Sequence, residues 1–458
     1  MMAGVVGGAR VVGGMRMRLR LGLWALAALM GLVPHPAPAA DPDPPILFVH
    51  GNGDSSALWE TDIWRFESNG YDPALLSAVD FTHPTARAAD DVPEANRSST
   101  ADQLGELKRA VDQVLAATGR DRLVLVGSSR GGYAIRNYIR NGGGRSTVSL
   151  AVLAGVPNHG VFALPFKLAS EFNGDGPFLR GLNKPQETDP GVRCVTLRSD
   201  RYDKFAQPTG EFVGFPYVPT FVSYTGPALE GAENIVLPGL DHRELAFDRR
   251  AFREIYRAVT GREAATLDPA PIDHPVLDGM VSGWENGAPT NLPLAGATVE
   301  LYEVNPETGL RLEGEPYRRV TGADGRWGPF TGSPTAYYEF VVSAAGYPTS
   351  HIYRTPFPRS LRYLQLRLRP VAPADATAGS LVILSRPRGY IALGRDRFLI
   401  DGAVPDGVDR GVPAVDSIAR HFDAGPPRSV PVSLNGEALT VRTFPLAEGQ
   451  VVLAEFHY

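Results

Sequence analysis

Cysteine is almost absent from this chain of 458 residues, because Cys194 is the only one. A single thiol cannot close a disulfide within the chain, so no disulfide framework stabilises the fold. We interpret Cys194 as a small buried hydrophobic residue rather than as a reactive thiol. Stability must therefore come from packed cores, and the length favours about three domains of roughly 100–200 residues each.

Long apolar runs are scarce as well. The apolar run at residues 21–33 is too short to cross a membrane. Ala37-Pro38-Ala39 follows it, and four basic residues precede it: Arg10, Arg16, Arg18 and Arg20. A basic segment, an apolar segment and a small-residue cleavage site, in that order, are typical of a secretory signal peptide. We therefore predict a signal peptide over residues 1–39 and a secreted protein, extracellular or periplasmic, with no integral membrane segment after cleavage.

An excess of positive charge is also lacking. The formal net charge is −5, and removal of the four arginines with no acidic residue leaves −5 − 4 = −9. A protein of this charge is a poor ligand for a phosphate backbone, so we expect no nucleic-acid partner.

The most informative segment that is present is Gly127-Ser128-Ser129-Arg130-Gly131. The apolar run at residues 123–126 predicts a buried strand before it, and residues 133–140, without Gly or Pro, can form a helix after it. A strand, G-x-S-x-G and a helix are the context of a nucleophile elbow. Side chains at positions 127 and 131 would collide with their neighbours in so tight a turn. The pattern predicts Ser129 as a catalytic nucleophile at the end of the sheet.

A second buried strand is predicted at residues 45–50, and it runs into His50-Gly51-Asn52-Gly53. Glycines at this place let backbone N–H groups approach a negatively charged oxygen. We therefore predict an oxyanion hole made of the backbone N–H groups of Asn52 and Arg130. An ordinary turn is the alternative interpretation of the first motif.

Alternating helices and strands predict a mostly parallel sheet. Residues 100–118 have the apolar spacing of a helix, with a capping box of Thr100 and Gln103 at the start and Gly119 at the end. A later helix is predicted between Asp248 and Gly261. Further strands are predicted at residues 148–153, 192–197 and 234–238.

Loops after the late strands hold the predicted acid and base. Residues 199–204 contain Asp200 and Asp203; we favour Asp203 as the triad acid and keep Asp200 as the alternative. His242 follows the last predicted strand and is the candidate base. The order Ser129, Asp203, His242 is the order of an α/β-hydrolase.

An apolar segment with interspersed glycines and prolines occupies residues 155–190, between two predicted strands of the sheet. It has two interpretations of equal standing. One is a mobile cover over an acyl pocket, and the other is a packed loop whose apolar residues belong to the core.

The pattern changes beyond the catalytic region. Prolines mark a linker at residues 263–277, and short predicted strands follow at 278–370 and 378–458. No complete catalytic set is visible in either β region, so we expect both to be dispensable for the chemistry and to adsorb to an insoluble substrate. Six aromatic residues are candidates for that adsorption, or else for the core: Trp284, Trp327, Tyr337, Tyr338, Tyr347 and Tyr353.

Residues from about 44 to 261 resemble the secreted α/β-hydrolase lipases of lipase class 2. The matching motifs are Val49-His50-Gly51-Asn52-Gly53, Gly127-Ser128-Ser129-Arg130-Gly131-Gly132, Ser199-Asp200-Arg201-Tyr202-Asp203 and Leu240-Asp241-His242. The resemblance implies a Ser-Asp-His triad, no metal, no cofactor and a lipid or ester substrate. A longer stretch between Asp203 and His242 departs from the family pattern and keeps Asp200 open.

The later segments resemble other known architectures. Residues 293–302 and 321–328 resemble a transthyretin-like, carboxypeptidase-regulatory-like β-sandwich, and a hydrolase followed by β domains is similar to an archaeal long-chain lipase. The expected fold is therefore α/β: an α/β-hydrolase fold at residues 44–262, with a mostly parallel sheet and flanking helices, followed by two small all-β domains.

The sequence as a whole predicts a secreted serine ester hydrolase, with a lipase as the first hypothesis. A short-chain esterase or a polyester depolymerase, of the polyhydroxyalkanoate kind, would use the same residues. An acyltransferase and a non-catalytic binding protein are the hypotheses from other classes.

Overall fold

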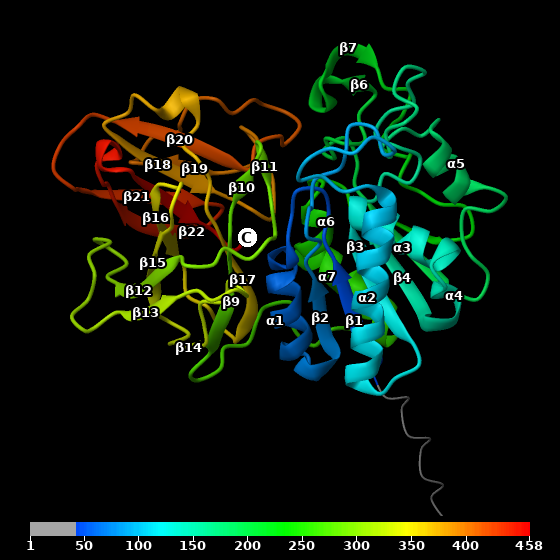
Figure 1. The fold of residues 1–458 in the computed structure, drawn as a ribbon, viewed down its shortest axis with the longest axis horizontal. Coiled ribbons are helices and arrows are strands. Elements are labelled where there is room, and N and C mark those ends of the chain that lie inside the picture. Colours follow the sequence, from blue (N-terminus) through cyan, green and yellow to red (C-terminus); the bar gives the residue numbers. More distant parts are fainter. Residues whose placement is uncertain (1–42) are drawn as a thin grey trace, which may run out of the picture. The chain divides into compact units, whose positions relative to one another are not determined.

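A six-stranded, fully parallel sheet forms the first part of the structure, a computed structural model that describes residues 43–458 (Figure 1). Its strands, in spatial order, are β2 (Leu76–Val79), β1 (Ile46–Val49), β3 (Leu123–Ser128), β4 (Val148–Ala154), β5 (Arg193–Arg198) and β8 (Glu233–Val236). The predicted signal peptide lies outside the described residues. Within residues 43–458, no helix has the length and apolar character needed to cross a membrane.

Helices cover both faces of this sheet (Figure 1). They are α1 (Glu60–Ser68), α2 (Thr100–Thr118), α3 (Arg130–Asn141), α4 (Gly144–Thr147), α5 (Pro177–Asn183), α6 (Glu244–Phe247) and α7 (Arg249–Thr260), with short 3₁₀ turns η1 (Ser56–Trp59), η2 (Pro73–Leu75) and η3 (Glu211–Val213). A small hairpin pairs β6 (Thr209–Gly210) with β7 (Phe215–Pro219).

Two apolar cores lie on opposite faces of the sheet. Alternate side chains of each buried strand enter opposite cores, because successive residues of a strand point to opposite faces. Phe48 and Val126 pack with α1 and α7 on one face. Leu47 and Leu125 pack with α2 and α3 on the other. The predicted α/β-hydrolase fold is confirmed by this parallel sheet and its two helical layers.

Helix α2 has the predicted bounds, but its N-terminal cap was predicted one residue too late. Ser99 is the N-cap: its Oγ accepts from the Asp102 N–H at 3.1 Å, and the Asp102 carboxylate accepts from the Ser99 N–H at 2.8 Å. Thr100 is already helical, and its N–H donates to Asp90 instead, at 2.7 Å. Gly119 ends the helix at φ 65°, as predicted.

The second part of the structure is built of strands (Figure 1). A seven-stranded sheet has the order β13 (Tyr317–Val320), β12 (Thr298–Val304), β15 (Tyr337–Ser343), β16 (Thr349–Arg354), β23 (Gln450–Glu455), β18 (Ser380–Ser385) and β20 (Ser417–Phe422). Smaller sheets are β14 (Phe330–Thr331), β9 (Val276–Ser282), β17 (Leu361–Arg367); β19 (Phe398–Ile400), β21 (Ser429–Leu434), β22 (Glu437–Arg442); and β10 (Trp284–Glu285), β11 (Ala288–Pro289). Two 3₁₀ turns complete it: η4 (Pro373–Asp375) and η5 (Leu446–Glu448).

Strand β23 joins the two predicted β regions. It pairs in parallel with β16 from residues 278–370 and with β18 from residues 378–458. The last strand of the chain therefore lies inside a sheet that both regions build. The predicted division into a catalytic domain, a linker and two β domains stays a prediction, but strand pairing couples the last two.

The β-rich part also shares buried surface with the α/β part. Trp64 of α1 is buried in the core of the β-rich part, and its Nε1 donates to the Ser360 carbonyl at 3.1 Å. Glu60 of α1 is fully buried and lies 3.1 Å from the Arg354 guanidinium and 3.5 Å from that of Arg388. Residues 43–458 consequently form one compact unit.

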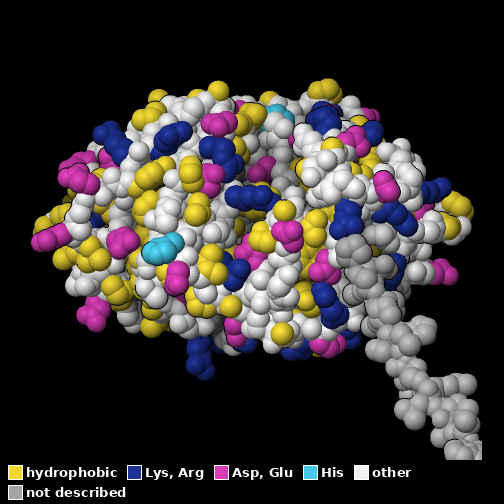
Figure 2. Space-filling model, turned by 90° about the horizontal axis from the view of Figure 1, so that it is seen from below, with side chains coloured by type: hydrophobic (Ala, Val, Ile, Leu, Met, Phe, Trp, Pro, Cys, Tyr) yellow, Lys and Arg dark blue, Asp and Glu magenta, His cyan; other side chains and the backbone are white. Residues whose placement is uncertain are grey.

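Three of the six aromatic candidates for surface adsorption are core residues. Trp327, Tyr338 and Tyr353 have at most 1% of their surface exposed, so they cannot contact an insoluble substrate. The other three are partly buried: Trp284, Tyr337 and Tyr347. On the face drawn in Figure 2, Lys and Arg side chains are interspersed with Asp and Glu side chains.

A protein truncated after Leu267 should fail to fold, although the sequence suggested that the β regions are dispensable. The truncation exposes Trp64 and removes both guanidinium partners of Glu60, and breaking a buried ion pair costs about 3–5 kcal/mol. Soluble yield and thermal unfolding followed by circular dichroism, beside the full chain, measure the effect. A soluble, cooperatively unfolding fragment would contradict this expectation.

Candidate active site

Ser129 occupies the turn between β3 and α3, with a φ of 51° that is unusual for a residue other than glycine. The neighbouring glycines are sterically required. A Cβ at position 131 would lie 2.5 Å from the carbonyl oxygens of Val49 and His50, and one at position 127 would lie 2.4 Å from Ile135 Cδ1. The collisions predicted at both positions are therefore confirmed. Helix α3 begins at Arg130, directly after Ser129 and earlier than the sequence indicated.

His242 and Asp203 are hydrogen-bonded to each other. The distance from His242 Nδ1 to Asp203 Oδ1 is 2.8 Å, and both side chains are buried. The Phe205 ring packs edge-on against the imidazole, with the ring centres 4.7 Å apart. His242 Nε2 is buried and has no hydrogen-bond partner within residues 43–458. The outer nitrogen is thus left available for a proton.

Asp200 has a different position from Asp203. Its carboxylate accepts from the backbone N–H groups of Tyr202 and Gly239, both at 3.1 Å. These bonds connect the loop after β5 to the loop after β8. Of the two predicted candidates, Asp203 contacts His242, and Asp200 holds the loop that carries Asp203.

Ser129 and His242 line the same cavity, of about 220 Å³, which we call the elbow cavity. Its other lining residues are mostly apolar: Asn52, Asp54, Val161, Phe162, Phe172, Phe205, Val213, Arg243 and Tyr390. The cavity therefore places a hydroxyl and an imidazole beside space suited to an apolar group.

The loop after β1 carries Asn52 to the same cavity. The Asn52 side chain accepts from the Ala86 N–H at 2.8 Å, which fixes the loop. His50 also holds this loop: its Nε2 accepts from the Phe81 N–H at 3.0 Å, and its Nδ1 donates to the Gly51 carbonyl at 2.8 Å. Burial lowers the pKa of His50, so the ring is neutral, as these bonds require.

Arg130 has its backbone N–H at the start of α3, where helix N–H groups have no partner within the helix. Its buried guanidinium lies 2.7 Å from Glu171 and 2.9 Å from the Ser98 hydroxyl. Sequence reasoning missed Glu171. Glu171 is the only acidic residue between positions 155 and 174, and a lone acid in an apolar segment is the signal that could have identified it. The pair attaches this segment to the turn that carries Ser129.

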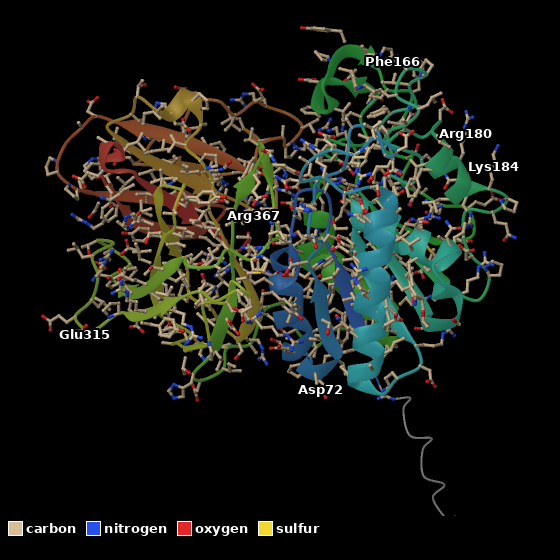
Figure 3. The ribbon with its side chains drawn as sticks, viewed as in Figure 1. Asp72, Phe166, Arg180, Lys184, Glu315 and Arg367 are labelled. Carbon is tan, nitrogen blue, oxygen red and sulfur yellow. The ribbon has the colours of Figure 1, made fainter. Side chains whose placement is uncertain are left out.

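The segment at residues 155–190 has both buried and exposed apolar residues. Phe162 and Leu164 are buried and pack with Phe215 of β7. Phe166, which Figure 3 shows at the β7 end of the structure, is 61% exposed, and Tyr217 on β7 is 98% exposed. The inner residues are a packed loop, while Phe166 and Tyr217 form an exposed apolar rim. Phe215 packs against both Phe166 and the cavity-lining Phe162 and so connects this rim to the elbow cavity.

Residues 386–395 of the C-terminal region hold the loop that carries His242. The Asp241 carboxylate accepts from the Tyr390 N–H at 2.8 Å and lies 3.1 Å from Arg386. Arg386 also lies 2.6 Å from Glu244, so it connects the residues on either side of His242 and Arg243. Sequence reasoning missed these contacts because the partners are about 145 positions apart and form no motif.

Electrostatics in this buried cluster depend on the arginines. Burial, with the nearby Glu244 carboxylate, raises the pKa of Asp241 to about 6. Burial also acts to raise the pKa of Glu244, but the charges of Arg386 and Arg395 outweigh burial and lower it.

Across residues 43–458, no group of three or more His, Cys, Asp and Glu side chains is arranged to hold a metal ion.

Family models match two segments of the chain. Residues 43–157 match the family described as Lipase (class 2), and residues 274–371 match the Lipase C-terminal domain. The predicted resemblance to class 2 lipases with a C-terminal β-rich part is therefore confirmed, and these matches support an ester hydrolase. No curated protein matches the chain.

Several solved structures are similar to parts of the chain. The mature Bacillus licheniformis lipase BlEst2 is 20% identical, over 49% of this chain and 96% of its own, with a TM-score of 0.37. Aspergillus fumigatus lipase B is 14% identical, over 49% of this chain and 54% of its own, with a TM-score of 0.34. Bacillus subtilis carboxylesterase CesB is 15% identical, over 48% of this chain and 85% of its own, with a TM-score of 0.28.

Replacing Arg386 by Met should destabilise the protein by about 3–5 kcal/mol, because it leaves the buried Asp241 and Glu244 carboxylates short of a partner. Urea unfolding measures the change. The matched control is Arg397→Met, an exposed arginine whose loss should change stability by no more than about 0.5 kcal/mol. Equal stability of the two variants would show that Arg386 does not hold this loop.

Proposed function

We propose that the protein is a serine ester hydrolase, and specifically a lipase. The observation that carries the proposal is the hydrogen bond between His242 and Asp203 beside a cavity that Ser129 also lines. Ser129 is the proposed nucleophile, His242 the base and Asp203 the acid of the triad. The backbone N–H groups of Asn52 and Arg130 are the proposed oxyanion donors.

The proposed reaction has two halves. Ser129 Oγ attacks the ester carbonyl carbon while His242 Nε2 takes the hydroxyl proton, and Asp203 stabilises the imidazolium through Nδ1–H. The oxyanion then collapses, the bond to the alcohol oxygen breaks, and His242 returns the proton to that oxygen. Water attacks the acyl-Ser129 with His242 again as base, which releases the carboxylic acid and restores the hydroxyl. The proposed mechanism uses no metal and no cofactor.

A lipid is the substrate class that the surroundings of Ser129 favour. Phe162 and Phe172 provide an apolar wall for an acyl chain, and the exposed Phe166 and Tyr217 form an apolar rim that Phe215 connects to Phe162. Exposed apolar groups of this kind suit contact with a lipid surface. We place substrate adsorption on this rim rather than on Trp327 or Tyr338, which are buried.

Export remains part of the proposal. It is supported by the order of basic, apolar and small residues over positions 1–39. The full chain lacks a second cysteine, so an oxidising compartment would not change its covalent structure.

Ser129→Ala should lower the hydrolysis of 4-nitrophenyl esters in plain buffer by about 10⁴–10⁶-fold while unfolding remains unchanged. A fluorophosphonate probe should label Ser129 in the wild type and leave Ser128 unlabelled. Retention of a tenth of the activity would rule out Ser129 as the nucleophile. If the wild type is active only with an added acyl acceptor, an acyltransferase is favoured. If it is inactive under all conditions, a non-catalytic binding protein is favoured.

The same assay separates the related hydrolases. A lipase should be most efficient with octanoate or palmitate esters and with emulsified triglyceride. A short-chain esterase should prefer acetate or butyrate esters, and a polyester depolymerase should instead clear a polyhydroxyalkanoate film.

Asp203→Asn and Asp200→Asn form a matched pair for the triad acid. Asp203→Asn should lower kcat by about 10⁴-fold, because the amide no longer orients and stabilises the imidazole. Asp200→Asn should keep most of the activity, because Asp200 bonds only to loop backbone and its own neighbours. The reverse result would assign the role to Asp200.

A further inference from the structure

A second cavity, of about 300 Å³, lies beside the elbow cavity and is rich in arginine. Asp54 and Arg243 line both cavities, so the two cavities adjoin. Arg243 directly follows His242 in the sequence, and Asp54 lies in the same loop as Asn52. We call it the arginine cavity, because five guanidinium groups line it: Arg243, Arg354, Arg367, Arg369 and Arg388.

Two of these arginines have no carboxylate partner. Arg367 ends β17 and Arg369 follows two residues later, and no carboxylate oxygen within residues 43–458 lies within 4.0 Å of either guanidinium. Arg367, labelled in Figure 3, donates through Nη1 to the Gly53 carbonyl at 2.9 Å and through Nη2 to the Asn291 side chain and the Asp54 carbonyl. Its buried Nε has no partner among the described residues. Arg369 makes one long side-chain hydrogen bond, to the Ser417 hydroxyl at 3.5 Å.

The carboxylates that line the arginine cavity are already paired with other arginines. Asp54 and Asp416 each lie 2.9 Å from Arg243, and Glu455 lies 2.8 Å from Arg354. Burial lowers the pKa of both Arg367 and Arg369, which means that the surrounding carboxylates do not compensate for lost hydration. A guanidinium removed from water without an anion is costly, and a bound anion would relieve that cost.

A third cavity, of about 430 Å³, begins where the arginine cavity ends. Trp284, Arg369 and Ser417 line both, so Arg369 stands at their boundary. Beyond that boundary most of the wall is apolar, with Val371, Leu381, Ile383 and Val451. We call this space the apolar cavity. Charge at one end and an alkyl-like wall at the other match an amphipathic anion.

We propose that Arg367 and Arg369 bind the anionic group of an amphipathic molecule, a carboxylate or a phosphate, whose alkyl chain lies in the apolar cavity. The planar guanidinium of Arg369 fits either anion with two parallel hydrogen bonds, and the unpartnered Nε of Arg367 supplies a further donor. The inference rests on the proposed function for its physiological ligand, since hydrolysis of a lipid ester releases a fatty acid next to this site. The site itself is independent of catalysis.

The test is calorimetric titration of the full-length Ser129→Ala protein, which allows binding to be measured without turnover. The ligands are laurate, dodecyl phosphate, dodecanol, acetate and inorganic phosphate. Laurate or dodecyl phosphate should bind with a 1:1 stoichiometry, and dodecanol, acetate and inorganic phosphate should bind at least about tenfold more weakly. Binding of laurate alone would identify a fatty acid as the ligand, and binding of dodecyl phosphate alone a phosphorylated lipid.

Variants assign the binding to this site. Arg369→Gln should lower the affinity for the amphiphile about tenfold. Arg369→Lys should lower it less, because lysine keeps the charge but not the planar pair of donors. Val371→Asn should weaken binding of the amphiphile, because it places a polar group against the alkyl chain in the apolar cavity. The matched controls Arg319→Gln and Val320→Asn change exposed residues of β13 and should bind like the parent.

Three results would overturn the proposal. They are absence of amphiphile binding, equal affinity of the parent and Arg369→Gln, and binding of acetate or inorganic phosphate as tight as that of the amphiphiles. Each of these results leaves ester hydrolysis by Ser129 standing. Loss of the proposed function would conversely appear as unchanged ester hydrolysis in Ser129→Ala, with the calorimetric result unaffected.

Discussion

Three carboxylates of the α/β part, Glu60, Asp241 and Glu244, are buried at 0%, 0% and 5% exposure, and each faces arginines from the C-terminal region. A buried carboxylate is strongly disfavoured unless a cation and further hydrogen bonds compensate it. The α/β part therefore depends on the β-rich part for more than added surface. The candidate active site sits on a fold whose buried charges are balanced only when the whole of residues 43–458 is assembled.

The same dependence extends to the candidate active site. The loop that carries His242 is held by Arg386 and by the backbone of Tyr390, whose ring lines the elbow cavity. On the opposite side, Arg367 donates to the Gly53 carbonyl in the loop that follows Asn52. Residues from the C-terminal region thus position both the proposed base and the proposed oxyanion loop. These contacts explain how a region without a catalytic set can still be required for geometry.

Charge and apolar character are divided among three adjoining cavities. The elbow cavity is mostly apolar around Ser129, the arginine cavity holds two guanidinium groups without carboxylate partners, and the apolar cavity follows beyond Arg369. In the proposed function, hydrolysis of a lipid ester presents an apolar chain and, after cleavage, an anion. The apolar walls of the elbow cavity and the apolar cavity suit the chain, and the arginine cavity between them suits the anion. Arg243, which directly follows His242, lies at the boundary between the elbow cavity and the arginine cavity.

Local sequence determined the elements whose cause is local. The strand at residues 123–126, the glycines on either side of Ser129 and the helix at residues 100–118 follow from apolar spacing and steric collisions between near neighbours. Even for the helix at residues 100–118, the N-cap is Ser99 and not the predicted Thr100, whose N–H donates to Asp90. Only the tertiary structure could bring Asp203 rather than Asp200 to His242, and Glu171 to Arg130.

The tertiary structure alone also decided which contacts the C-terminal region makes with the rest of the protein. Its strands could be read from their pattern, but the insertion of β23 between β16 and β18 could not, because strand pairing has no local signal. Nor could the pairing of Glu60 with Arg354 or of Asp241 with Arg386, which are separated by 294 and 145 positions. The physical reason is that burial selects partners by position in space, and that position exists only once the chain has folded.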